Sequence, residues 1–307
     1  MTPSHLNRRQ FLEWTALAAS TLVLTSCSST GTKPTTRRTA ADQIALGNTG
    51  LRISRIGFGT GSNSGQVQHA LGQQEFNRLI RHAYDQGVTY FDCAQSYRTF
   101  DWMADAIKGL PRERVFIQSK IGGKPEKILE NIDRHRSVFK TDYIDSMLIH
   151  CMVKDGWTDE WKRIMDAFDE AKDKKWILSK GVSCHSLPAL RNATTSPWTQ
   201  VHLVRVNPQG KHVDGMDETW NKPGSQISPV LEELRKMHAK GRGIIGMKII
   251  GNGDFTNPED REKSIRFAMS LPEIHSIVIG FKSTAEIDEA IQRVNSALAE
   301  QPVKLAA

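Results

Sequence analysis

The chain has 307 residues, and 38% of them are hydrophobic, which is enough for one large α/β barrel or two small domains. The formal charge is +7 and the isoelectric point is about 9.2, but the N-terminal segment and a polar linker carry much of this excess. A mildly basic surface with no nucleic-acid partner is therefore expected. The four cysteines form no Cys-x-x-Cys pair, so neither a metal site nor a disulfide framework is predicted.

Residues 1–27 resemble an export signal rather than part of a fold. Arg8 and Arg9 precede an apolar run, Trp14–Leu24, as in a twin-arginine signal, and the run is too short for an ordinary transmembrane helix. The run closes with Leu-Thr-Ser-Cys27, which resembles a bacterial lipobox. The resemblance implies export by the twin-arginine machinery and a lipid on Cys27 that anchors the protein at the periplasmic face of a membrane. The alternative is an uncleaved disordered tail.

The next segments lead into the main domain. Residues 28–42 are rich in Ser and Thr and poor in apolar groups, so they predict a flexible tether. Leu46–Ile53 predicts a short hairpin that turns at Asn48-Thr49-Gly50. Residues 43–300 are expected to form one domain, because strands and helices alternate throughout them.

Eight strand-like runs alternate with eight helix-like runs in this domain. Strands are expected near residues 54–58, 88–92, 115–120, 143–149, 177–183, 201–206, 243–249 and 276–280. Helices are expected near residues 73–86, 100–109, 124–139, 158–174, 187–194, 227–240, 257–270 and 283–298. This order predicts a closed (β/α)8 TIM barrel. A doubly wound open sheet is the alternative, which the absence of G-x-G-x-x-G after the first strand disfavours.

Four groups suited to proton transfer stand at or just beyond the ends of three successive strands. Asp92 ends V-T-Y-F-D and Tyr97 follows it in the loop, while Lys120 ends V-F-I-Q-S-K and His150 ends Y-I-D-S-M-L-I-H. Taken singly, such a lysine is more often a solvated charge and such a histidine a structural residue. Active sites of (β/α)8 barrels lie at the C-terminal ends of the strands, so the four side chains are expected to share one site.

The chemistry of these groups suits the transfer of a proton to an oxygen. Hydride delivery to a carbonyl leaves an alkoxide, and free tyrosine, with a pKa of about 10, gives up its proton slowly at neutral pH. A neighbouring Lys120 would lower the pKa of Tyr97, and Asp92 would keep that lysine charged and oriented. His150 would donate a hydrogen bond to the substrate oxygen.

The same residues resemble the catalytic tetrad of the aldo/keto reductases. F-D-C-A-Q-S-Y, I-Q-S-K and M-L-I-H carry the resemblance, and residues 46–60, 181–185, 246–251 and 279–290 extend it over about residues 43–298. The resemblance implies a (β/α)8 barrel, Tyr97 as the acid/base, and NAD(P)(H) as the cofactor that carries the hydride.

The resemblance also implies where the cofactor binds. Cys184 replaces the usual asparagine, Leu203 the usual glutamine, and Glu286 an arginine or glutamine. Lys282 and Ser283 suit a 2′-phosphate, which slightly favours NADP(H) over NAD(H); the alternative for Lys282 and Glu286 is a solvated first helical turn. The implied contacts are Gly59, Thr60, Ser183, Lys248, Gly280, Lys282, Ser283 and Glu289.

The segment Asn207–Gln226, which we call the strap, is long for a βα loop. Its His212, Met216 and Trp220 are candidates to line a substrate pocket or to close over the cofactor, and the alternative is a surface excursion. Twin-arginine export carries folded proteins, so we expect a nucleotide bound before export and held by the strap.

The sequence thus predicts an exported oxidoreductase that interconverts a carbonyl and an alcohol in a small-molecule substrate. The alternative is a non-catalytic binding or scaffold protein at the cell envelope, built on the same barrel. The replaced cofactor contacts favour the scaffold, and the complete tetrad favours the enzyme.

Overall fold

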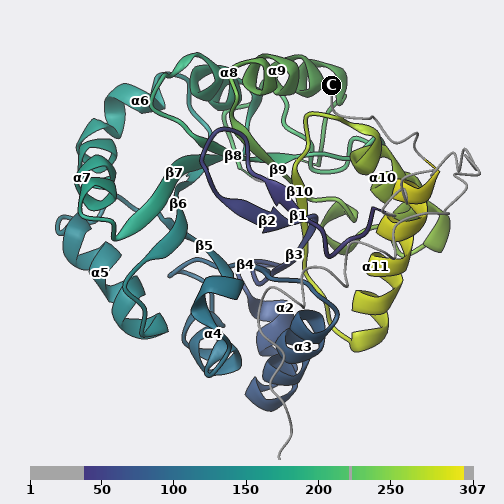
Figure 1. The fold of residues 1–307 in the computed structure, drawn as a ribbon. Coiled ribbons are helices and arrows are strands. Elements are labelled where there is room, and N and C mark those ends of the chain that lie inside the picture. The colour runs from purple at the N-terminus through teal and green to yellow at the C-terminus, as the bar shows by residue number, and fades with distance from the viewer. Residues whose placement is uncertain (1–37, 221–222, 301–307) are drawn as a thin grey trace, which may run out of the picture. The chain divides into compact units, whose positions relative to one another are not determined.

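A computed structural model describes residues 38–220 and 223–300 of the chain. The predicted signal peptide, Cys27 and most of the predicted tether lie outside the described residues. Eight parallel strands close into a barrel in the order β10-β3-β4-β5-β6-β7-β8-β9, and helices surround them (Figure 1). The predicted (β/α)8 TIM barrel is confirmed, and the open-sheet alternative is wrong.

Each barrel strand overlaps one of the predicted strands. The longest of them, β6, contains a register shift between Ile149 and Met152, where Cys151 adopts a positive φ of 65°. The strands are β3 (Ile56–Gly59), β4 (Tyr90–Asp92), β5 (Phe116–Ile121), β6 (Ile144–Met152), β7 (Ile177–Cys184), β8 (Val201–Arg205), β9 (Gly243–Met247) and β10 (Ser276–Ile279).

The helices follow the predicted order with two differences. The single helix expected over residues 158–174 breaks at Trp161, whose buried ring accompanies a non-helical backbone with φ of −104° and ψ of 12°. The short α2 was not predicted. The helices are α2 (Gln66–His69), α3 (Gln73–Asp85), α4 (Phe100–Ile107), α5 (Ile128–Phe139), α6 (Trp157–Glu160), α7 (Lys162–Asp173), α8 (Leu187–Thr195), α9 (Ser228–Ala239), α10 (Pro258–Ser270) and α11 (Thr284–Ala299), with 3-10 turns η1 (Arg112–Arg114) and η2 (Gly251–Gly253).

None of the helices within the described ranges is both long enough and apolar enough to cross a membrane. Their sequence signals explain where several of them begin. Ser186, Asn257 and Ser283 each cap a helix with a side-chain oxygen that accepts a backbone N–H, and a proline stands in the first turn of α8, α9 and α10.

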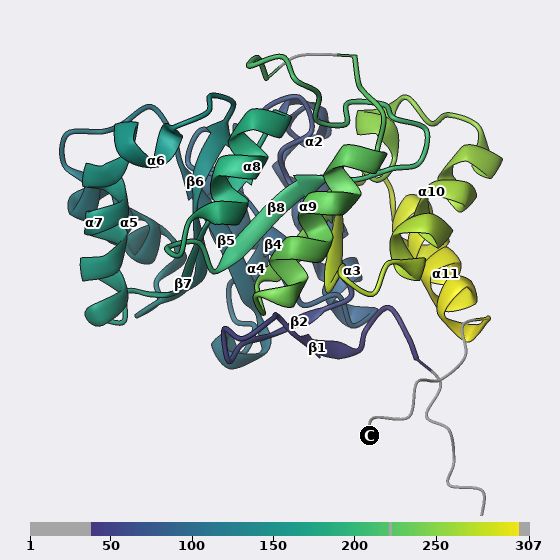
Figure 2. The same cartoon turned by 90° about the horizontal axis from the view of Figure 1, so that it is seen from above.

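The predicted hairpin closes the N-terminal end of the barrel. It consists of β1 (Gln43–Ala45) and β2 (Arg52–Ser54), which pair antiparallel and lie beneath the barrel in Figure 2. The Asn48 N–H donates to the carbonyl of Gly241 at 2.8 Å, and Gly47 approaches the same segment so closely that a Cβ would lie 2.5 Å from backbone atoms of Arg242 and Gly243. The open mouth of the barrel is therefore at the opposite end, where the strands terminate.

Apolar side chains from the hairpin and the strands fill the lumen, so the barrel interior is a packed core. The cluster comprises Leu46, Ile53, Tyr90, Phe116, Leu148, Val201, Leu203, Ile245, Met247 and Val278. A larger apolar layer packs the outer faces of the strands against the helices. These two packed apolar layers fix the positions of the strand ends.

Candidate active site

The structure brings together the four predicted proton-transfer residues at the C-terminal mouth of the barrel. Asp92 is the last residue of β4, Lys120 lies in β5, His150 in β6, and Tyr97 in the loop after β4. Lys120 Nζ donates to both carboxylate oxygens of Asp92, at 2.6 and 2.7 Å, and to the carbonyl of Cys93 at 2.8 Å. Tyr97 Oη lies 3.3 Å from His150 Nε2, and Lys120 Nζ lies 5.1 Å from the centre of the Tyr97 ring.

The charges in this cluster are set by burial as well as by neighbours. Lys120 is almost completely buried, which alone would lower its pKa, but Asp92 and Tyr97 raise it, and the net pKa is above the ordinary value. Burial and the charge of Lys120 lower the pKa of His150 to about 3, so its ring is neutral.

The expected lowering of the Tyr97 pKa is only partly correct. Burial raises the pKa of this phenol to about 12, and Lys120 offsets part of that rise. The free-energy cost of desolvating the phenolate is larger than the stabilisation that one neighbouring ammonium ion provides. Tyr97 is therefore a protonated phenol at neutral pH, next to a neutral His150.

Three supporting residues were missed by sequence reasoning. A Cβ on Gly61 would lie 2.7 Å from the Tyr97 hydroxyl, so only glycine leaves room for the phenol. Gln118 and Tyr90 lie beneath Asp92, where Gln118 Nε2 donates to Asp92 Oδ1 at 2.9 Å and to the Tyr90 hydroxyl at 2.8 Å. Gln118 precedes Lys120 by two residues on β5, so the two side chains face the same side of the strand. This alternation in the sequence could have identified Gln118 as a neighbour of the site.

Two predicted cofactor contacts lie close to the tetrad. Thr60 donates from its backbone N–H and its hydroxyl to the carbonyl of Asp92, at 2.9 and 3.0 Å, which ties the end of β3 to the end of β4. Ser183 Oγ accepts the N–H of Cys151 at 2.9 Å, which fixes the irregular end of β6. Both side chains thus support the mouth of the barrel directly.

Lys248 follows β9 at the same mouth. Its Nζ donates to the neutral amide oxygen of Asn252 at 2.6 Å, and burial together with Arg205 lowers its pKa to about 8. A partly desolvated cation beside a neutral acceptor is suited to an anion such as a phosphate. Gly59 ends β3 and Gly280 follows β10 at the same mouth, and a Cβ on Gly280 would overlap the Ser62 hydroxyl.

The remaining predicted contacts lie away from the tetrad, at the start and on the side of α11. Ser283 caps α11 by accepting the N–H of Glu286 at 3.2 Å, and the Glu286 carboxylate accepts the N–H of Lys282 at 2.7 Å. The Lys282 side chain is largely exposed, 3.8 Å from Glu286. Glu289 accepts from Arg261 and Arg293, so its carboxylate is already paired within the protein.

A buried ion pair that was not predicted stands where β8 ends. Arg205 Nε lies 3.5 Å from Asp214 Oδ1, with side-chain exposures of 3% and 0%, and neither Asp214 oxygen has a hydrogen-bond partner in the described part of the chain. Burial raises the pKa of Asp214 to about 7, although Arg205 opposes this. Arg205 Nη2 also donates to the carbonyl of Trp220 at 2.6 Å and contacts His185. The strand-end rule that selected Lys120 would also have selected Arg205.

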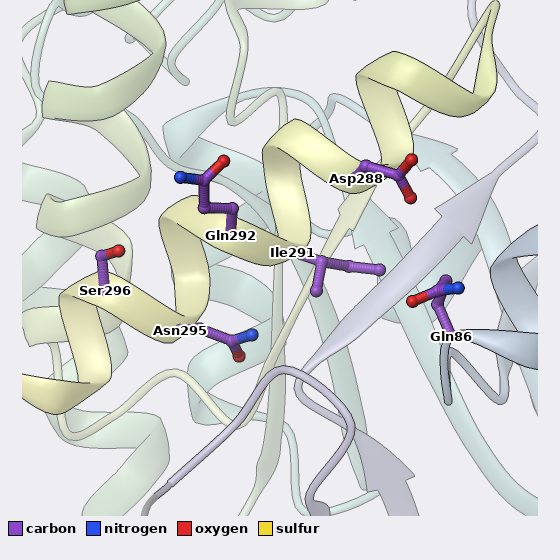
Figure 3. A pocket seen from close by; sticks show the side chains of 6 residues that line it. All are labelled: Gln86, Asp288, Ile291, Gln292, Asn295 and Ser296. Atoms are coloured by element: carbon purple, nitrogen blue, oxygen red, sulfur yellow. The ribbon is translucent and has the colours of Figure 1, made fainter.

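A hollow on the flank of the barrel lies between the end of α3 and α11 (Figure 3). Its lining is mostly polar and contains none of the predicted site residues: Gln86, Asp288, Ile291, Gln292, Asn295 and Ser296. Among the described residues, no group of three or more His, Cys, Asp or Glu side chains is placed to hold a metal ion. The mouth of the barrel is therefore the candidate active site.

The sequence pattern behind this geometry matches a known family. The model of the aldo/keto reductase family matches residues 55–307. The chain belongs to the aldo/keto reductase family. The curated relatives that match it include named oxidoreductases, so this aldo/keto reductase is an enzyme of that type.

Individual relatives are distant. L-Galactose dehydrogenase of Arabidopsis thaliana is 29% identical over 292 residues, which cover 81% of this chain and 87% of that enzyme. The 9,11-endoperoxide prostaglandin H2 reductase of Trypanosoma cruzi is 28% identical over 163 residues. This match covers 52% of this chain and 54% of that enzyme, so the chain spans about half of the length of that relative. An aldo-keto reductase of Klebsiella pneumoniae, solved in complex with NADPH, has a TM-score of 0.61 at 16% identity over 83% of this chain and 89% of that chain, which shows the shared fold.

Proposed function

We propose that the protein uses Tyr97 as the acid/base in an NAD(P)(H)-dependent interconversion of a carbonyl and an alcohol. One observation carries the proposal: Lys120 is held by both oxygens of Asp92, beneath a Tyr97 hydroxyl that also reaches His150. A buried ammonium, a protonated phenol and a neutral imidazole form a complete device for moving one proton to a substrate oxygen.

In the proposed mechanism, the substrate oxygen lies between Tyr97 and His150. NAD(P)(H), when bound at the mouth, would supply or accept the hydride. Tyr97 Oη gives its proton to the substrate oxygen during reduction and takes it back during oxidation. His150, neutral because its pKa is about 3, donates a hydrogen bond to the same oxygen. Lys120 stabilises the phenolate that remains on Tyr97, and Asp92 keeps Lys120 in place.

We further propose that NADP(H) is preferred over NAD(H). Lys248 and the exposed Lys282 offer two cations for phosphate groups, and Ser283 adds a hydroxyl at the N-terminus of α11. Glu286 beside Lys282 weakens this preference. The NADPH complex of the Klebsiella pneumoniae structure supports the assignment.

The substrate class that we favour is a sugar or a similar polyol. L-Galactose dehydrogenase of Arabidopsis thaliana, which is named for a sugar, matches 81% of this chain at 29% identity. Met216 and Trp220 of the strap are 63% and 61% exposed, and an exposed indole gives a flat apolar face against which a sugar ring packs. Both residues lie in the loop that follows β8, at the mouth of the barrel.

Tyr97→Phe tests the proposed function. Turnover should fall by about 10²-fold or more, because the substitution removes the transferable proton, while NADP(H) affinity should stay nearly unchanged. Steady-state kinetics with NADPH and a panel of sugars and small carbonyl compounds, together with nucleotide titration, measure both quantities. The control is Tyr84→Phe, which removes a phenolic hydroxyl from α3, away from the site, and should leave turnover unchanged. Unchanged turnover in Tyr97→Phe would remove Tyr97 from the mechanism, and a wild-type protein that binds nucleotide without any turnover would favour the scaffold.

We also propose that the enzyme is exported by the twin-arginine pathway and anchored through a lipid on Cys27. The support is the order of Arg8-Arg9, the apolar run and the lipobox-like Leu-Thr-Ser-Cys27 in the sequence. Export would place the enzyme where free nucleotide is scarce, so the cofactor would have to enter with the folded protein.

A further inference from the structure

The carboxylate that holds Lys120 is itself held from below. Gln118 and Asp92 are register partners on β5 and β4, and Gln118 is completely buried. Its Nε2 donates to Asp92 Oδ1 at 2.9 Å, the same oxygen that receives Lys120 Nζ at 2.6 Å. The amide of Gln118 therefore reaches the catalytic ion pair directly, on the side away from the mouth.

The chemistry of the neighbours fixes the orientation of this amide. An ionised Asp92 accepts hydrogen bonds and donates none, so the NH2 group of Gln118, and not its oxygen, must face the carboxylate. The second N–H of Gln118 donates to the Tyr90 hydroxyl at 2.8 Å. Burial and the neighbouring Asp92 carboxylate raise the pKa of Tyr90, so its hydroxyl keeps its proton. Lys120 and Gln118 thus both donate to one carboxylate, and the Tyr90 hydroxyl holds the amide of Gln118.

Tyr90 is rigid enough to serve as the base of this network. Its ring is completely buried and packs edge-on against Phe116, with centroids 5.6 Å apart and an interplanar angle of 90°. On the neighbouring strand, residue 57 is a glycine, and any Cβ there would overlap the Tyr90 ring. The hydroxyl therefore has one position, fixed by packing on both sides.

We propose that Gln118 and Tyr90 are positioning residues, which lock the Asp92 carboxylate so that Lys120 stays aligned with Tyr97. The inference rests on the proposed role of Tyr97. A carboxylate held only by a lysine can turn about its own side-chain torsion, and the ammonium turns with it. The amide of Gln118, held in turn by the Tyr90 hydroxyl, removes that freedom, which preorganises the site before a substrate arrives.

Variants that remove each of these groups test this inference. Gln118→Met keeps the length of the side chain and removes both N–H groups, and Tyr90→Phe removes only the hydroxyl. Each should lower kcat by about 10-fold with little change in KM for the nucleotide, because the alignment of the proton donor is disturbed. Ser179→Ala removes another buried hydroxyl of the barrel, which donates to the carbonyl of Asp145, and it should leave kcat unchanged.

A cycle with Asp92→Asn separates positioning from a purely structural role. If Gln118 acts through the Asp92 carboxylate, Gln118→Met should cost less than about 2-fold in kcat once that carboxylate is an amide. A full 10-fold loss in the Asp92→Asn background, or no loss in the wild-type background, would overturn the inference. The inference and the proposed function fail differently: a protein that loses turnover with Tyr97→Phe but keeps it with Gln118→Met and Tyr90→Phe would reject only the inference.

The same double-mutant cycle can be measured on stability, which requires no substrate. Urea unfolding of the wild type, both single variants and the double variant reports whether Gln118 and Asp92 stabilise the fold jointly. The two single shifts in midpoint should sum to more than the shift of the double variant. Additive shifts would show that the two side chains are independent, which would overturn the inference whether or not turnover has been found.

Discussion

The protonation state of Tyr97 shows how burial and charge compete at a single residue. Lys120 lies 5.1 Å from the phenol ring and favours the phenolate, yet burial raises the pKa of Tyr97 to about 12. At neutral pH the hydroxyl keeps its proton, and His150 carries no charge that would repel a substrate proton. We infer that the free enzyme is prepared for reduction, because the acid form of Tyr97 is the one that a developing alkoxide requires.

A second residue, Asp214, makes a testable contribution to stability. Burial raises its pKa from 3.8 to about 7, so the folded protein keeps a proton that the unfolded chain has already released. The stabilising contribution is present below about pH 4 and is lost as the pH rises towards 7, by on the order of 4 kcal/mol in total. Asp214→Asn mimics the protonated side chain and should remove this decline.

Unfolding in urea between pH 4 and pH 8 measures the effect as the difference between the wild type and Asp214→Asn. Taking the difference matters because His150, His185 and His202 have lowered pKa values, so they destabilise the fold in acid in both proteins. The variant should gain stability relative to the wild type as the pH rises from 4 to 7. A constant difference over that range would show that Asp214 is ionised throughout.

The strap is the long loop that follows β8 at the mouth of the barrel. The described part of the strap is fastened to several neighbouring parts of the structure. Asp155 donates its N–H to Glu218 at 2.8 Å, Leu187 donates its N–H to the carbonyl of Gly215 at 2.8 Å, and Gln209 reaches Asp260 at 2.9 Å. Arg205 adds an attachment at Trp220 and Asp214, and His212 adds another at Asp254. A cover fixed at this many points opens slowly.

We expect Arg205→Met to loosen the strap and to speed the release of NADP(H). The substitution removes the hydrogen bond to the Trp220 carbonyl and the contact with Asp214, two of the attachments of the strap. The off-rate should rise by about 10-fold while the on-rate changes less, because related complexes differ mainly in their off-rates. Stopped-flow nucleotide fluorescence measures both rates.

Arg242→Met is the matched control. Arg242 precedes β9 at the other end of the barrel, where it donates to the carbonyls of Ser196 and Pro197 and touches no part of the strap. Its loss should leave nucleotide release unchanged. An off-rate in Arg205→Met equal to that of the wild type would mean that the strap does not retain the cofactor.

At the scale of the whole molecule, the repeated strand–helix pattern predicts the barrel and the four residues at its strand ends. Those features follow from local periodicity and from one topological rule. The supporting contacts do not follow in this way. Gln118 reaches Asp92 only through the register of β4 with β5, and Asp214 comes from a loop to which no periodic pattern applies. The break at Trp161 depends on where a large ring is buried.

The position of the first described residues bears on how an anchored enzyme would work. Arg38 Nη2 donates to the carbonyl of Leu298 at 3.2 Å, and the Ala40 N–H donates to Asn295 Oδ1 at 2.8 Å. Both contacts lie on the last turns of α11, at the end of the barrel that the hairpin closes (Figure 2). The chain thus enters the domain at the end opposite the mouth.

Cys27→Ala should move the protein from the membrane fraction to the soluble fraction of the envelope without changing its catalysis. Lipid chains hold a protein at a membrane in proportion to their buried length, so losing the acceptor cysteine removes the anchor. Because the tether enters opposite the mouth, kcat/KM of the released protein should stay within about 2-fold of the membrane-bound enzyme, a difference of about 0.4 kcal/mol. Arg8→Lys with Arg9→Lys should instead keep the folded enzyme in the cytoplasm. Cys27→Ala protein that stays with the membrane would contradict the lipid anchor, and a large gain in activity on release would show that the anchored mouth is obstructed.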